Sequence, residues 1–190
     1  ISVTTALSEH LIAEVKRDGK LWRLELRKGI PVTDDAIMVG PAEGKGTTIK
    51  FKPDLTIMEP NEWNFDTLAA RLRELAFLNK GVEIKLIDER TSKESIFKYD
   101  GGIKQFVEHL NKGKQSLHKV FYFEKNKDNY GVETALQYTT DYSETVHSFV
   151  NNINTHEGGT HLSGFKTALT RTINKYAEKH KLLEKDITLS

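Results

Sequence analysis

The stretch from Leu11 to Leu26 reads LIAEVKRDGKLWRLEL. Apolar and polar side chains alternate over residues 11–16 and again over residues 21–26, which is the period of a strand with one buried face. Asp18 and Gly19 lie between the two runs, and an Asp-Gly pair suits the positive φ angles of a tight turn. This stretch predicts a β-hairpin and makes the first part of the chain mostly sheet.

The residues that follow predict more strands and one helix. Residues 36–39 predict a third strand, and residues 47–51 predict a fourth that ends at Pro53. Beyond them the apolar period becomes helical, with one face made of Phe65, Leu68, Ala69, Leu72, Leu75 and Ala76. Residues 82–88 and 94–99 predict another strand pair. We expect one amphipathic helix to cover the sheet of this part.

A new pattern begins at Asp100-Gly101-Gly102. A short helix is predicted by the spacing of Ile103, Phe106, Val107 and Leu110. Strands are predicted at 120–124, 132–138 and 146–153, and a long last helix carries on one face Leu162, Phe165, Leu169, Ile173 and Tyr176. We place a domain boundary after Tyr99, dividing the chain into 1–99 and 100–190, with a hinge at Gly101-Gly102.

Composition limits the class of protein. A chain of 190 residues allows one or two domains, and 37% hydrophobic with 29% charged residues is ordinary for a soluble folded protein. The net charge of +1 gives no whole-chain field for nucleic acid, so any DNA contact must come from a local patch. The absence of cysteine excludes disulfides and thiolate metal sites and suits a cytoplasmic protein.

No apolar run approaches the roughly 18 residues that a membrane span requires. The chain begins at Ile1 without a methionine, a basic segment or a cleavage site. We therefore expect a piece of a longer protein that does not cross a membrane.

The loop HEGGTH brings two histidines near a glutamate. Zinc sites usually have three or four ligands, and no third ligand accompanies His156 and His161 at helical spacing. We interpret Gly158 and Gly159 as a turn into the last helix, with Thr160 as the N-cap of that helix. No metal site is predicted.

An unrelated hydrolase finds no support. The glycines and lysine of Gly44-Lys45-Gly46-Thr47 lack the spacing of a Walker loop, and no nucleophile elbow occurs in the chain.

Four longer stretches carry a resemblance to a known family. They are GTTIKF at 46–51, RLRELAFLN at 71–79, YDGGI at 99–103, and SFVNNINT at 148–155 followed by EGGTH at 157–161. In these stretches, which span most of the chain in the family's order, the protein resembles the B subunits of bacterial type II DNA topoisomerases. Residues 154–161 and 170–174 are more similar to gyrase than to topoisomerase IV, whose B subunit stays the alternative.

The resemblance implies an α+β fold that periodicity does not predict. Residues 1–99 would form the C-terminal part of a GHKL ATP-binding domain, which is a layered sandwich. Residues 100–190 would form the first part of a transducer domain similar to domain 2 of ribosomal protein S5.

The resemblance also implies an ATP site, of which this chain holds an edge. Thr47 matches a threonine that holds the adenine end, a role that a hydroxyl fills as donor and acceptor. Ile49 would line the same pocket, and Ile1 and Ser2 would follow the lid over the phosphates. Arg17 matches a pocket-mouth arginine that contacts coumarin inhibitors. On the residues alone, the commoner cases are an ordinary strand threonine at Thr47, a core isoleucine at Ile49 and a hairpin arginine at Arg17.

No catalytic residue is assigned to this chain. In the family, a magnesium-binding asparagine and a glutamate base precede the stretch that these residues match, and a lysine on the γ-phosphate follows it. We therefore expect the 190 residues to bind ATP weakly and not to hydrolyse it.

The resemblance implies ATP and Mg²⁺ as cofactors. It implies three partners: DNA, the gyrase A protein in a heterotetramer, and a second copy of the B protein through ATP-dependent dimerisation. On the last helix, Lys166, Arg171 and Lys175 could meet DNA phosphate, or could form a solvated charged face, which is the commoner case. A non-catalytic structural module with weak DNA binding remains the alternative function.

Overall fold

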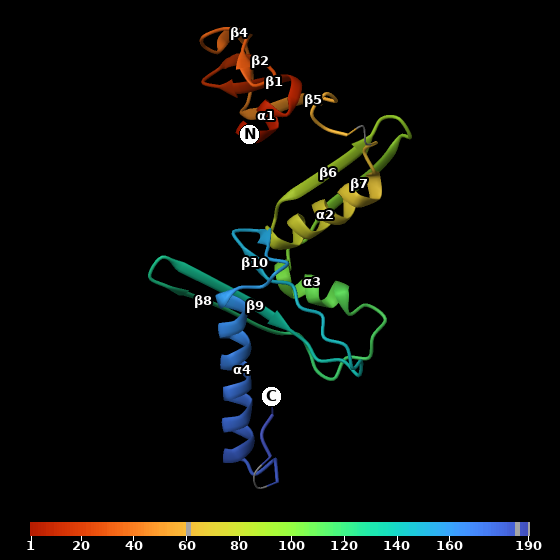
Figure 1. Cartoon of the computed structure of the whole chain (residues 1–190), viewed down its shortest axis with the longest axis vertical. Coiled ribbons are helices and arrows are strands. Elements are labelled where there is room, and N and C mark those ends of the chain that lie inside the picture. The colour runs from red at the N-terminus through yellow and green to blue at the C-terminus, as the bar shows by residue number, and fades with distance from the viewer. Residues whose placement is uncertain (60–61, 185–186, 190) are drawn as a thin grey trace. The chain divides into compact units, whose positions relative to one another are not determined.

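A computed structural model describes residues 1–59, 62–184 and 187–189. The chain forms two compact units, Ile1–Trp63 and Asn64–Ser190, which are described separately. Figure 1 shows the helices and strands of both units, coloured from red at the N-terminus to blue at the C-terminus.

The first unit is an antiparallel sheet preceded by one short helix. Its elements are α1 (Ser2–Ala6), β1 (Ser8–Arg17), β2 (Lys20–Arg27), β3 (Ile30–Pro31), β4 (Ile37–Pro41) and β5 (Gly46–Pro53). The strands run in the order β3-β2-β1-β5, and β4 also pairs with β2. The predicted hairpin is confirmed as β1 and β2, and its turn has φ values of 53° at Asp18 and 74° at Gly19.

One face of this sheet is apolar because alternate residues of three paired strands share it. On β1 this face carries Leu11, Ala13 and Val15. Their partners on β2 are Leu26, Leu24 and Trp22, and on β5 Phe51, Ile49 and Thr47. Leu11 is buried at the end of the sheet nearest α1. The opposite face carries charged pairs such as Glu14 with Arg23.

In the part of the second unit that the structure describes, there are three helices and several hairpins. Its elements are α2 (Phe65–Leu78), β6 (Glu83–Asp88), β7 (Lys93–Lys98), α3 (Gly102–Leu110), β8 (Phe121–Lys127), β9 (Tyr130–Leu136), β10 (Phe149–Val150), β11 (Ile153–Asn154) and α4 (Thr160–Lys179). In Figure 1, α2 lies along the β6–β7 hairpin. The predicted helical face of α2 packs there: Ala69 and Ala76 are buried against Phe97 of β7.

An aromatic stack continues this core from α2 to α3. The ring of Phe77 lies 3.6 Å from that of Tyr99 and 5.0 Å from that of Phe106, measured between centroids. The predicted hinge at Gly101-Gly102 is therefore wrong, because packed rings join the residues on its two sides. The assignment of 1–99 and 100–190 to two family domains stays a prediction.

Two local predictions are corrected in the last third of the unit. Residues 146–153 do not form one strand: β10 and β11 form a hairpin whose turn residues, Asn151 and Asn152, have φ values of 49° and 65°. Thr160 is the first residue of α4 and not its N-cap. Gly159 holds the cap position, and no side chain caps the helix.

No helix among the residues that the structure describes is long and apolar enough to cross a membrane.

Candidate functional site

The start of β5 and the end of β1 enclose a shallow hollow in the first unit. Thr47 pairs with Val15, and Gly46 pairs with Lys16. The hollow has a volume of about 360 Å³ and is lined by Val15, Lys16, Arg17, Asp18, Lys45, Gly46 and Thr47. The structure thus brings together Thr47 and Arg17, which the sequence singled out from stretches 30 residues apart.

The hollow presents the Thr47 hydroxyl beside the positively charged side chains of Lys16, Arg17 and Lys45. Strand alternation places Arg17 on the same sheet face as Val15 and Thr47. The Arg17 Nε lies 3.3 Å from a carboxylate oxygen of Asp18, and both side chains are largely exposed. The Thr47 hydroxyl can donate one hydrogen bond and accept up to two, and the Arg17 guanidinium can donate to an anion or a carbonyl.

The other residues predicted for the nucleotide site lie apart from the hollow. Ile49 shares the face of Thr47, two residues farther along β5, but does not line the hollow. Ile1 and Ser2 begin α1, where the carbonyl oxygen of Ile1 accepts hydrogen bonds from the amide and hydroxyl of Thr5. The structure therefore unites two of the five predicted residues of this site in one hollow.

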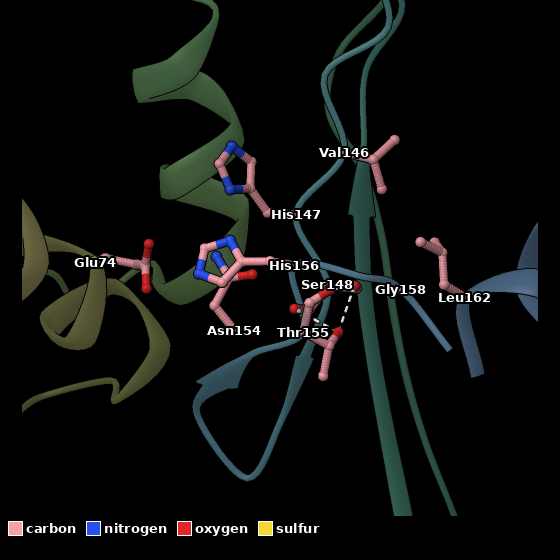
Figure 2. A pocket seen from close by; sticks show the side chains of 9 residues that line it. All are labelled: Glu74, Val146, His147, Ser148, Asn154, Thr155, His156, Gly158 and Leu162. Carbon is pink, nitrogen blue, oxygen red and sulfur yellow. Dashed lines mark hydrogen bonds between the residues drawn. The ribbon is translucent and has the colours of Figure 1, made fainter. Parts of the chain in front are cut away.

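A second hollow, of about 330 Å³, lies in the second unit between α2 and the segment before and after the β10–β11 hairpin. Figure 2 shows its lining residues, which are Glu74, Val146, His147, Ser148, Asn154, Thr155, His156, Gly158 and Leu162. The Ser148 and Thr155 hydroxyls lie 2.6 Å apart, and the Thr155 hydroxyl lies 3.2 Å from His161 Nε2.

These contacts give the HEGGTH loop a structural role. Gly159 has a φ of 145°, and a Cβ there would lie 2.9 Å from the His161 ring, so this position requires glycine. Among residues 1–59, 62–184 and 187–189, no group of three His, Cys, Asp or Glu side chains could hold a metal ion.

Glu74 was not singled out from the sequence, although it lies inside a quoted stretch. Its Oε1 is buried without a hydrogen-bond partner and is ion-paired with Arg71, three residues earlier on α2. Arg-x-x-Glu spacing on a helix was the signal available for this pair.

The basic residues of α4 differ in their surroundings. Lys166 Nζ lies 3.0 Å from the Glu144 carboxylate, so part of its charge is already balanced. Arg171 and Lys175 are exposed and lie one helical turn apart on the same face. These two cations are better placed than Lys166 for an outside anion.

Comparison with known proteins gives a consistent result. The sequence model of a family described as DNA gyrase B matches residues 102–189. Over 192 aligned residues, the chain is 52% identical to the B subunit of DNA gyrase from Clostridium acetobutylicum, covering 100% of this chain and 30% of that protein. Over 188 residues, it is 50% identical to the B subunit of DNA gyrase from Haloferax lucentense, covering 97% of this chain and 29% of the other.

Solved structures agree with the sequence matches. The 43K ATPase domain of Thermus thermophilus gyrase B, solved with an aminocoumarin, superposes with a TM-score of 0.82 at 34% identity, covering 98% of this chain and 51% of that one. The B-subunit of the DNA gyrase from Myxococcus xanthus gives a TM-score of 0.85 at 28% identity, covering 93% and 52%. The chain thus spans about 30% of the two curated relatives and about half of these solved chains.

Proposed function

This chain belongs to the DNA gyrase B family, and from that membership we propose that it serves the ATP-driven step of a type II DNA topoisomerase. In this proposal, ATP binding and hydrolysis drive DNA strand passage and negative supercoiling. The observation that carries it is the hollow that Thr47 and Arg17 share. The two curated relatives are both gyrase proteins, which favours gyrase over topoisomerase IV.

The proposed role of the hollow is to hold one end of the nucleotide. Thr47 would bond the adenine through its hydroxyl, and Ile49 would extend the same sheet face toward the base. Ile1 and Ser2 are proposed to lie at the phosphate edge, and Arg17 at the mouth, where an aminocoumarin would contact it. Mg²⁺ is proposed as the companion of the ATP phosphates, held by residues other than these.

The proposed partners follow from the same membership. They are DNA, the gyrase A protein and a second copy of the B protein that pairs when ATP binds, all in the cytoplasm. Within this chain, Arg171 and Lys175 are the proposed DNA contacts, with a smaller part for Lys166 because of its ion pair with Glu144.

The nucleotide proposal is tested by titrating the chain with a non-hydrolysable ATP analogue and following amide NMR signals. We expect the signals of Gly46 and Thr47 to move, with a dissociation constant in the millimolar range, or about −4 kcal/mol. Thr47→Val should weaken binding by about twofold to tenfold, the worth of one hydrogen bond.

Thr48→Val is the matched control, because Thr48 pairs with Glu14 and belongs to the other sheet face. An aminocoumarin titration adds a second arm, in which Arg17→Ala should weaken binding and Thr48→Val should not. Equal effects of Thr47→Val and Thr48→Val would contradict the assignment of the hollow.

The DNA proposal is tested by the salt dependence of duplex binding. The double variant Arg171→Glu, Lys175→Glu should weaken duplex binding equally for all DNA sequences. The slope of the logarithm of the binding constant against the logarithm of the salt concentration should become shallower by about 1 for each phosphate that the protein no longer contacts. Lys166→Glu should have a smaller effect. An unchanged binding curve for the double variant would remove α4 as a DNA contact.

A further inference from the structure

Two residues of α2, Arg71 in its middle and Asn79 at its C-cap, hold the turn of the β10–β11 hairpin through polar contacts. The side-chain amide of Asn152 donates a hydrogen bond of 2.8 Å to Oδ1 of Asn79, the residue that follows α2. The guanidinium of Arg71 donates a hydrogen bond of 3.3 Å to the backbone carbonyl of Asn152. The two hydrogen bonds span 73 and 81 residues of the sequence.

The turn presents Asn152 at a conformational cost. Both turn residues have positive φ, where most side chains crowd the backbone and asparagine is among the better tolerated types. Glycine would adopt this conformation at less cost than asparagine. The Asn152 side chain is therefore not required by the turn, whereas the bond to Asn79 needs its amide donor.

The helix side of the contact is equally constrained. The side-chain nitrogen of Asn79 donates a hydrogen bond of 2.7 Å to the backbone carbonyl of Leu75 in α2. The same carbonyl also accepts a hydrogen bond of 3.1 Å from the backbone amide of Asn79. Arg71 is ion-paired with Glu74. Each group that holds the turn is thus itself fixed to α2.

We propose that Asn152 and Asn79 form a latch that makes α2 and the β10–β11 hairpin move as one body. The latch joins α2, in the predicted nucleotide-binding part, to residues of the predicted transducer part. Its biological meaning rests on the proposed function, in which a change at the nucleotide must reach the transducer. Asn79 and Asn152 act as positioning residues that touch no substrate.

The latch is tested in this chain by amide hydrogen exchange. The Thr155 amide, bonded to the Ser148 carbonyl at 2.8 Å, reports the base of the hairpin, and the Asn79 amide reports the end of α2. Asn152→Gly keeps the backbone conformation and removes the side chain. It should speed exchange at both reporters by about twofold to tenfold, the worth of one hydrogen bond.

Coupling between two sites is reciprocal, so Asn79→Ala should speed exchange at Thr155 by a similar factor. Asn151→Gly is the matched control, because Asn151 shares the positive φ but not the bond to Asn79, and it should leave the Asn79 amide unchanged. If Asn152 acts only within the turn, Asn152→Gly would change the exchange rate of the Thr155 amide and not that of the Asn79 amide. That result would overturn the latch. Circular dichroism verifies that each variant is folded.

None of these measurements involves ATP or DNA. A failure of the latch therefore leaves the proposed function standing, and a failure of the titrations leaves the latch standing.

Discussion

Asp54 is a buried carboxylate in the first unit, just after β5. Its Oδ1 accepts hydrogen bonds from the Thr56 hydroxyl at 2.7 Å and the Thr56 amide at 2.9 Å, and Lys28 Nζ lies 3.2 Å from its Oδ2. The bond from the Thr56 hydroxyl, followed by that from the amide and the charge of Lys28, lowers the pKa of Asp54 below its usual 3.8, although burial opposes this. The folded state therefore favours the ionised form.

Acid should remove this contribution to stability. Because the folded pKa of Asp54 is depressed, its stabilisation is present above the unfolded pKa of 3.8 and is lost as the pH falls through the lower folded value. Asp54→Asn should lower the thermal midpoint of the first unit at neutral pH, and the two midpoints should converge as the pH falls below the folded pKa of Asp54. A difference that stays constant with pH would show that the carboxylate charge contributes nothing.

At the level of single residues, the family resemblance and not a local pattern singled out Thr47 and Arg17, and their roles stay predictions. Thr47 and Arg17 could be named, but their common hollow depends on the long-range register of β1 with β5, which no local pattern specifies. The turn at Asn151 and Asn152 was missed because the apolar spacing of 146–153 resembles a strand and does not reveal φ. An Asn-Asn pair, tolerant of positive φ, was the signal available.

At the scale of elements, α2 and α4 begin in different ways. Asn64 is the N-cap of α2, in an extended conformation, and its Oδ1 accepts the Thr67 amide at 2.9 Å and the Thr67 hydroxyl at 3.1 Å. At the start of α4 no side chain accepts an amide, because glycine holds the cap position before Thr160. A Ser or Thr near a predicted helix start is therefore not enough to locate the cap when glycines precede it.

This difference predicts unequal effects of two alanine substitutions. Asn64→Ala should destabilise the second unit by about 1 kcal/mol, because it removes the acceptor for an amide that α2 cannot satisfy itself. Thr160→Ala should change stability by less than about 0.5 kcal/mol. Urea unfolding measures both, and Asn64→Asp, which keeps an acceptor, is the conservative control. Equal losses for both alanine variants would contradict the assigned caps.

At the scale of the whole molecule, the structure and the family resemblance divide the chain at different places. The compact units meet after Trp63, whereas the predicted family boundary follows Tyr99. The matched family model begins at residue 102. The difference concerns α2, β6 and β7, which share the core of Ala69, Ala76 and Phe97. The ring stack of Tyr99, Phe77 and Phe106 continues this core to α3. The spacing of apolar residues predicts α2, β6 and β7 well. It does not specify whether these elements pack with the core before them or with the core after them.

The aromatic residues provide separate reporters for the two units. Both tryptophans, Trp22 and Trp63, lie in the first unit. All six tyrosines lie in the second, at Tyr99, Tyr122, Tyr130, Tyr138, Tyr142 and Tyr176. Tryptophan fluorescence therefore follows the first unit, and tyrosine ring signals in NMR spectra follow the second.

Phe77→Ala should destabilise the second unit alone. The Phe77 side chain is 1% exposed and stacks on Tyr99 and Phe106, so its loss should cost about 3–5 kcal/mol there. The unfolding midpoint of the tyrosine signals should fall while the midpoint of tryptophan fluorescence stays unchanged. Leu11→Ala, at an equally buried position of the first unit, should do the reverse. If Phe77→Ala instead lowers the tryptophan midpoint as well, α2 unfolds together with the sheet of β1 and β5, and the cooperative boundary is not at Trp63.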